Sequence, residues 1–292
     1  MTQNGTILIC VLPDLRDELL HQYLASAVSF ARQVGFDVHF LIPPDTQEAL
    51  SSVLSEIPPH ELHAIKTVSH PIAGNWPPRV VSESVKIYSC DLIVVPSGGI
   101  TEDKGYEAQV RKDLLEQASA PILILSPKID LVKTPIGSVL VPMSGEIRIS
   151  SALKFGLRFA SRIHVPADLV HVIQEDAQTE SPLETTGDQP HHEYRELLDK
   201  VIAEATPFSG MKERAQVRTL YHVQGTPSVE ILKIAKRTSS CALVVEWHGS
   251  LIHGKAKTLK ELLCQVTFPL FLVKTEIQQQ STLKIGPENQ VA

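Results

Sequence analysis

Histidine, lysine and glycine side chains gather in one short stretch of the second half of the chain. The stretch follows an apolar run and precedes a helical pattern, and its members are His248, Gly249, Ser250, His253, Gly254, Lys255 and Lys257. Lysine supplies positive charge, and glycine lets backbone N–H groups approach a bound anion closely. Because ligands of open α/β sheets bind beyond the carboxyl ends of the strands, this composition is typical of an anion site. The simpler alternative, a solvated basic face on a short loop, stays open beside it.

A second glycine-bearing stretch, Ser97-Gly98-Gly99, follows an apolar run in the first half. Glycines at the end of a strand can place backbone N–H groups around a phosphate. The acidic side chains that come next in the chain would repel a phosphate, and they are Glu102, Asp103 and Glu107. A tight strand-to-helix turn without a ligand is therefore the favoured interpretation of this stretch.

Other kinds of chemistry find little support in the residue pattern. Serine, histidine and aspartate are plentiful, but no segment resembles the Gly-x-Ser-x-Gly motif of a nucleophilic serine. The adjacent His191 and His192 would diverge on a helix, so they do not form a metal-binding pair. The cysteines include no C-x-x-C pair and are expected to be buried thiols, and they are Cys10, Cys90, Cys241 and Cys264. We therefore predict no catalytic residue, no metal and no enzyme activity.

Composition narrows the classes of function further. The 292 residues carry a net charge of −6 and are 43% hydrophobic, which is typical of a globular chain and not of a nucleic-acid binder. No segment reaches the roughly 18 uncharged apolar residues that span a bilayer. The N-terminus lacks the basic region of a signal peptide. We expect a cytoplasmic protein without membrane insertion or bound nucleic acid.

Short apolar runs alternate with helical patterns along the whole chain. Helical spacing covers residues 19–34, 152–163 and 229–237. Most apolar runs are continuous, as expected of parallel strands covered on both faces. Strands that alternate with helices form βαβ units, so we predict an α/β fold with helices on both faces. The predicted strands are Ile7–Leu12, Val38–Ile42, Leu92–Val95, Ile122–Leu125, Val139–Val141, Leu169–Ile173, Val217–Val223, Ala242–Val245 and Leu270–Val273.

An internal repeat divides the chain in two. Ser89-Cys90-Asp91-Leu92 is echoed by Ser240-Cys241-Ala242-Leu243, and Ala120-Pro121-Ile122 is echoed by Phe268-Pro269-Leu270. Two echoes in the same order indicate tandem copies of one domain. We predict domains over residues 1–130 and 131–276, a hinge between them at Pro127–Pro135, and a polar tail over 277–292. Residues 174–190 are acidic and lack periodicity, which predicts a loop inside the second copy.

The two halves resemble the universal stress protein family in its tandem form. In the second half, Ser138–Glu146 is similar to the family's first strand and loop, and Gly225-Thr226-Pro227 to the start of its penultimate helix. Cys241–Trp247 and Phe268–Lys274 are similar to its last two strands. The resemblance implies two five-stranded, mostly parallel sheets with helices on both faces, the adenine-nucleotide alpha-hydrolase-like fold. It also implies that the last strands of the two copies pair inside the chain.

One branch of this family binds ATP or AMP, through an acidic residue after the first strand and a glycine-rich loop after the fourth strand. In the first half, Asp14 stands where the acid is expected and Ser97-Gly98-Gly99 opens the loop. Ala108 and Gln109 occupy the place of the family's later Gly-Ser/Thr pair. The resemblance therefore implies a damaged nucleotide site in this half.

The second half departs from the nucleotide-binding pattern as well. Ser144 stands at the place of the acid, the loop from Gly249 to Gly254 is several residues short, and Ala256 and Lys257 replace the Gly-Ser/Thr pair. We expect no family-standard ATP binding in either half and no cofactor. If a ligand does bind, the candidate residues are Asp14, Ser97, Gly98, Gly99, His248, Gly249, Ser250, Gly254, Lys255 and Lys257.

The function that the sequence favours is that of a non-enzymatic stress-response or regulatory protein. It would act by binding a protein partner, or an anionic ligand in its second half. One alternative is an ATP or AMP sensor with non-standard contacts. Another is a scaffold or assembly subunit of a larger complex, and a homodimer beyond the internal pairing also stays open.

Overall fold

The computed structural model describes residues 5–11, 17–43, 46–56, 67–71, 78–97, 113–143, 150–173, 217–238, 241–248, 257–265 and 267–275. The strands within these ranges are β1 (Thr6–Cys10), β2 (Asp37–Ile42), β3 (Thr67–Pro71), β4 (Leu92–Pro96), β5 (Ile122–Leu125), β6 (Ser138–Met143), β7 (Ala167–Ile173), β8 (Val217–Gln224), β9 (Cys241–Trp247) and β10 (Leu270–Lys274). The helices are α1 (Asp17–Val34), α2 (Gln47–Ser55), α4 (Pro78–Ile87), α6 (Ser151–Arg162), α8 (Pro227–Arg237) and α9 (Lys257–Cys264).

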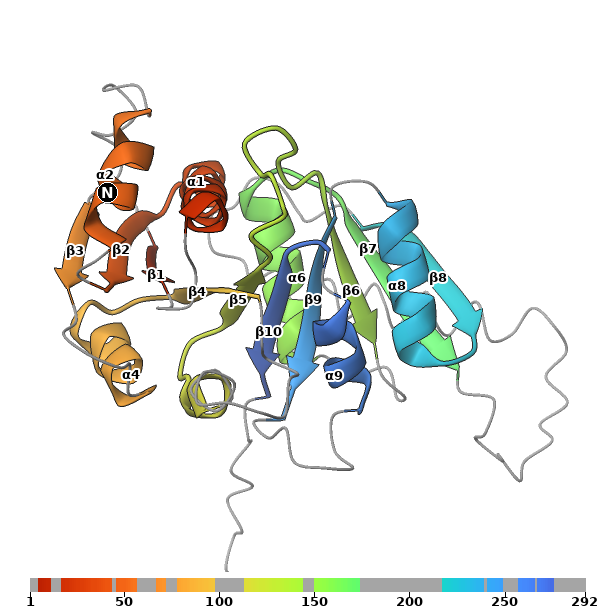
Figure 1. The fold of residues 1–292 in the computed structure, drawn as a ribbon. Helices are drawn as coiled ribbons and strands as arrows, with labels where there is room; N and C mark the ends of the chain where they lie inside the picture. Colours follow the sequence, from red (N-terminus) through yellow and green to blue (C-terminus); the bar gives the residue numbers. More distant parts are fainter. Residues whose placement is uncertain are drawn as a thin grey trace, which may run out of the picture.

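All of these strands form one sheet in the order β3-β2-β1-β4-β5-β10-β9-β6-β7-β8. Neighbouring strands are parallel within each half. Only β5 and β10 are antiparallel, and they join the halves at the middle of the sheet (Figure 1). The second half therefore repeats the strand order of the first in the opposite direction across the sheet. This confirms the predicted α/β class. The last strands of the two halves, β5 and β10, pair inside the chain, as the resemblance implied, and this pairing joins the two five-stranded units into one sheet.

Helices cover both faces of the sheet, and each face has one hydrophobic core that runs through both halves. On one face α1, α2 and α6 contribute to a core that includes Ile7 and Ile9 of β1 and Val139 and Val141 of β6. On the other face α4, α8 and α9 pack over residues such as Leu8 and Ile93. β4 and β5 are buried along their whole length, which explains why their sequences are continuous apolar runs.

An aromatic cluster ties the first half to the second. Phe30 of α1 lies 6.0 Å from Phe159 of α6 and 5.9 Å from Phe271 of β10, measured between ring centroids. Phe155 and Phe159 lie 5.4 and 4.7 Å from Phe271. Phe30 and Phe271 have no exposed surface. Tilted ring pairs at these distances are favourable beyond the area that they bury, so the cluster fixes how the helices of the two halves meet.

The segment between β5 and β6 is bound to α1 along one face of that helix. Ser26 Oγ donates a hydrogen bond to the Ile129 carbonyl at 2.6 Å, and Ser29 Oγ donates to the Leu131 carbonyl at 3.0 Å. One turn later, Gln33 exchanges two hydrogen bonds with the Ile136 backbone, at 2.7 and 3.1 Å. The predicted hinge lies in this segment and is held in place. The predicted domain limits stay a prediction, and residues 174–190 and 277–292 lie outside the described residues.

Glycine at position 156 lets α6 approach the sheet closely. A Cβ atom there would lie 2.6 Å from Val141 Cγ2 of β6. Branching at Cβ restricts the side-chain rotation of valine, so Val141 cannot move aside cheaply. The observed close packing of α6 against β6 therefore requires glycine at position 156.

We predict that Gly156→Ala lowers the free energy of unfolding by about 1–3 kcal/mol, the usual effect of overpacking a core. The higher helix propensity of alanine offsets at most about 1 kcal/mol of this loss. Urea unfolding followed by far-UV circular dichroism measures the change. Lys154→Ala, at an exposed position of the same helix, is the control and is expected to change stability by less than about 0.5 kcal/mol. An unchanged or higher stability of Gly156→Ala would contradict the close packing.

Candidate functional site

Three of the ten candidate ligand residues lie in the described part of the chain, namely Ser97, His248 and Lys257. The other seven lie outside the described residues, and they are Asp14, Gly98, Gly99, Gly249, Ser250, Gly254 and Lys255. His191 and His192 also lie outside them. The structure therefore tests the surroundings of the predicted sites rather than the loops themselves.

The described candidates are engaged in contacts with the protein. The Ser97 backbone N–H donates to the Leu125 carbonyl at 2.9 Å, which extends the pairing of β4 with β5. His248 Nδ1 lies 2.9 Å from Thr275 Oγ1, so the residue after β9 is linked to the residue after β10. Lys257 opens α9, and its Nζ lies 4.0 Å from Glu261 Oε1 one turn later. Ser97 belongs to the first half and the other two to the second, so the structure does not assemble them into one site.

A carboxylate that the sequence analysis missed occupies the start of α6. Glu246 Oε1 of β9 accepts a hydrogen bond from the Ser151 backbone N–H at 3.1 Å. Ser150 caps the same helix, and its Oγ accepts from the Leu153 N–H at 3.1 Å. A helix N-terminus carries partial positive charge and favours an anion. Here the anion belongs to the protein, at the carboxyl edge of the second half.

Tyr23 occupies the corresponding region of the first half. Its hydroxyl lies 2.8 Å from the Cys10 carbonyl of β1 and 3.2 Å from the Val94 carbonyl of β4. The ring is fully buried, and this burial raises the pKa of the phenol well above its usual value, so the group stays protonated and can donate. The strand order changes direction between β1 and β4, and such a switch point is where open α/β sheets bind ligands. The hydroxyl therefore joins the two strands at that crevice.

An ion pair between a buried carboxylate and a half-exposed arginine lies at the opposite edge of the second half. The Asp168 carboxylate of β7 has no exposed surface, and Arg218 of β8 contacts both of its oxygens, with Nε 3.1 Å from Oδ1. The pairing of β7 with β8 shifts register beside Asp168, which places Arg218 within reach. Two-point contact makes this a strong charge-assisted interaction. It explains how a carboxylate is tolerated inside the sheet.

The described residues hold no group of three or more histidine, cysteine, aspartate or glutamate side chains able to bind a metal. His171 and His222 form a pair across β7 and β8, with their Nδ1 atoms 3.3 Å apart.

Within the described ranges, none of the helices has the length and apolar character that crossing a membrane requires.

Comparison with known protein families finds a match for the second half of the chain. Residues 135–273 match the sequence model of the universal stress protein family. The second half of the chain is therefore similar to a universal stress protein domain. No curated protein matches the sequence significantly.

Solved structures extend the likeness to the whole chain at the level of the fold. A universal stress protein from Archaeoglobus fulgidus is 17% identical, with a TM-score of 0.60 over 93% of this chain and 99% of that one. A putative universal stress protein from Pseudomonas aeruginosa is 16% identical, with the same TM-score over 93% and 94%. The cytoplasmic domain of a prokaryotic cation chloride cotransporter is 9% identical, with a TM-score of 0.52 over 92% and 95%. Identities this low show a shared fold and no shared activity.

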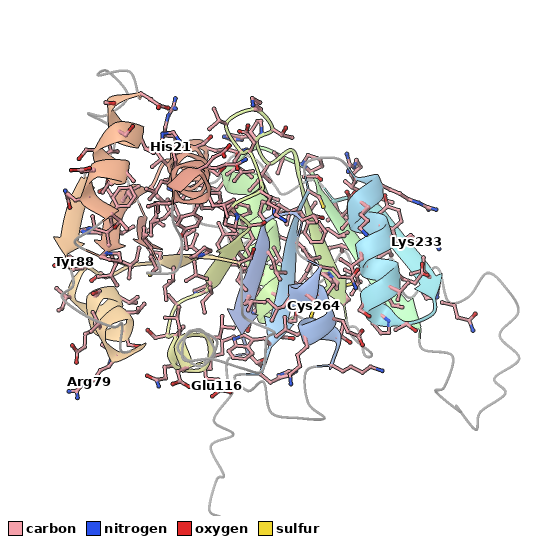
Figure 2. The ribbon with its side chains drawn as sticks, in the orientation of Figure 1. His21, Arg79, Tyr88, Glu116, Lys233 and Cys264 are labelled. Carbon is pink, nitrogen blue, oxygen red and sulfur yellow. The ribbon has the colours of Figure 1, made fainter. Side chains whose placement is uncertain are left out.

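Three of the four cysteines are buried as predicted, but Cys264 is exposed at the end of α9 (Figure 2). Burial and the charge of Asp91 raise the pKa of Cys90 to about 11. Burial and the charge of Asp168 raise the pKa of Cys241 to about 12, and burial raises that of Cys10 well above its usual value. Because the thiolate is the nucleophile, these three thiols are unreactive in the folded domain.

We predict that Ellman's reagent at about pH 8, below the raised pKa values of the buried thiols, modifies one cysteine per folded chain rapidly. The reactive residue is Cys264. In denaturant all four cysteines are expected to react. Cys264→Ser removes the rapid phase and serves as the control. A second rapid thiol in the folded protein would contradict the described burial.

Proposed function

We propose that the chain is a two-domain universal stress-type protein that acts by binding and not by catalysis, and that neither half binds ATP in the family's way. The observation that carries this proposal is the Glu246 carboxylate at the start of α6, hydrogen-bonded to the Ser151 N–H. A phosphate approaching that helix end would meet a negative charge where the fold otherwise offers a positive one.

The first half supports the same conclusion by a different route. The Tyr23 hydroxyl spans the carbonyls of Cys10 and Val94 at the crevice between β1 and β4. A ligand group that reached the carbonyls of Cys10 and Val94 would have to replace a buried hydrogen bond, and leaving a buried polar group unpaired costs about 1–3 kcal/mol. Together with the altered glycine-rich loops of the sequence, this favours a function without a bound nucleotide.

A binding role fits the chemistry of the described side chains. The buried cysteines have raised pKa values and are poor nucleophiles. The buried Asp168 carboxylate of the second half is paired with Arg218, so its burial has a structural explanation. We propose a regulatory protein of the cytoplasm whose partner is another protein or a small anion.

A thermal-shift titration with ATP, ADP, AMP and cyclic dinucleotides tests the proposal. A ligand at about 100 times its dissociation constant stabilises a protein by roughly 2.7 kcal/mol, which raises the melting temperature of a chain of this size by roughly 5 °C. We predict that none of these nucleotides produces such a shift, because Glu246 contacts the start of α6 and the glycine-rich loops of both halves depart from the nucleotide-binding pattern.

A clear shift with any of these nucleotides would contradict the proposal and favour the nucleotide-sensor alternative. Two variants then locate the site. Asp14→Ala would remove a shift that arises in the first half, and Lys257→Ala one that arises in the second. Lys154→Ala, an exposed lysine of α6, is the matched control for loss of a positive charge.

A further inference from the structure

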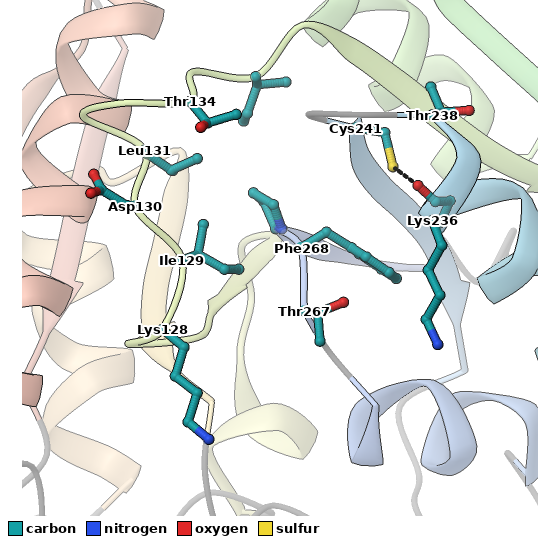
Figure 3. Close-up of a pocket in the computed structure, with 13 residues that line it drawn as sticks. Lys128, Ile129, Asp130, Leu131, Thr134, Lys236, Thr238, Cys241, Thr267 and Phe268 are labelled. Carbon is teal, nitrogen blue, oxygen red and sulfur yellow. Dashed lines mark hydrogen bonds between the residues drawn. The ribbon is translucent and has the colours of Figure 1, made fainter.

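A cavity of about 380 Å³ lies where the two halves meet. The segment between β5 and β6 forms one wall, and the end of α8 and the residues before β10 form the other (Figure 3). Small-molecule sites in proteins have volumes of about 300–1,000 Å³. The size is therefore sufficient for a small ligand, and much of the lining is apolar, with contributions from Ile129, Leu131, Ile136 and Phe268.

Both walls are held in place by the protein. On one side α1 binds the carbonyls of Ile129, Leu131 and Ile136. On the other side the Leu243 N–H donates to the Pro269 carbonyl at 2.8 Å, and Cys241 Sγ donates to the Ala235 carbonyl at 3.4 Å. A cavity with fixed walls needs little ordering when a ligand binds, which favours affinity.

Two lysines give one end of the cavity a positive charge. Lys128 follows β5 and Lys236 lies in the last turn of α8, and both extend to the same side with Thr267 between them in Figure 3. Within the described ranges neither lysine forms an ion pair. Asp130 also lines the cavity, but its carboxylate is 3.0 Å from Lys133 Nζ. The hydrogen bonds from Lys133 lower the pKa of Asp130, so this carboxylate is charged and already paired.

We propose that this cavity binds a small amphipathic anion. The apolar body of the ligand packs against Ile129, Leu131 and Phe268, and its single anionic head lies at the open end of the cavity, on the side to which Lys128 and Lys236 extend. Both a carboxylate and a phosphate ester suit two lysines, which act as point charges without a fixed donor geometry. The shared chemistry is an apolar chain with one anionic head.

This site is separate from the edge at which the family's nucleotides would bind. The cavity lies beside the amino ends of β9 and β10, at Cys241 and Pro269, whereas His248 follows the carboxyl end of β9. The inference goes beyond the proposed function, because it holds whether or not a nucleotide binds elsewhere.

Isothermal titration calorimetry of the full chain with four probes tests the proposal. The probes are octanoate, octyl phosphate, octanol and octylammonium, each below its aggregation concentration. We expect both anions to bind, octanol to bind about tenfold more weakly or worse, and octylammonium not to bind, because the charge-assisted contact with lysine is available only to the anions. The ratio of the two anion affinities shows which head group the site prefers.

Charge and shape are tested separately by variants. Lys128→Met and Lys236→Met keep the apolar stem and remove the charge, and each is expected to weaken octanoate binding by about five- to tenfold. Lys233→Met is the matched control, because Lys233 lies on the same helix one turn earlier (Figure 2) and pairs with Glu230 outside the cavity. It is expected to leave affinity within about twofold. Thr267→Trp places a large side chain at an exposed position in the opening and should abolish binding.

Equal affinities for octanol and octanoate would overturn the proposal, as would octanoate binding that both lysine variants and Thr267→Trp leave unchanged. The nucleotide titration described above tests the proposed function independently. A shift of the melting temperature with ATP would reject the proposed function but would not bear on the cavity. Failure of octanoate to bind would reject the cavity proposal but would not bear on the proposed function.

Discussion

The antiparallel contact between β5 and β10 is the constraint on which the rest of the structure depends. Along it Ile122, Leu123 and Ile124 pair with Leu272, Phe271 and Leu270, and all of these side chains are buried. Each half alone would expose an apolar strand edge, which favours aggregation. Pairing covers both edges, continues each hydrophobic core across the junction, and brings α1 against α6. The cavity between the halves exists because the same contact sets the linker beside the end of α8.

Much of the fold could be predicted because its strands are covered on both faces and therefore appear as continuous apolar runs. The strand β3, Thr67–Pro71, was missed because its residues TVSHP are mostly polar and it lies at the edge of the sheet. The sequence echo and the strand pairing differ by one residue. The sequence echo aligns Leu92 with Leu243, whereas the structure pairs Ile93 with Ile122 and Leu243 with Leu270. Side chains alternate between faces, so a shift of one residue exchanges the two cores, and identical letters do not detect it.

The occupied edges of the two halves could not be predicted for a different reason. Glu246 contacts Ser151, which is 95 positions away in the sequence, and Tyr23 contacts Val94, which is 71 positions away. The only local sign was an acidic residue inside the apolar run of β9. Interpreting it requires knowing that α6 starts beside that strand, which depends on the crossover of the chain and on the close approach at Gly156. The loops that the sequence singled out adjoin these groups in the chain.

A carboxylate fixed within the chain changes the competition for a helix N-terminus. The fraction of helix ends that a free phosphate occupies depends on the phosphate concentration. The Glu246 carboxylate is part of the chain, so it is always present beside the start of α6 at a high effective concentration. An anionic ligand at this helix end would have to displace the Glu246 carboxylate. Its affinity would be lowered by the cost of leaving that carboxylate without a hydrogen-bond partner and by the repulsion between the two negative charges. The same fold occurs in universal stress proteins and in the cytoplasmic domain of a cotransporter. In this chain a carboxylate of β9 fills the positive end of α6, so a single residue of the neighbouring strand determines what charge that helix end presents to an anion.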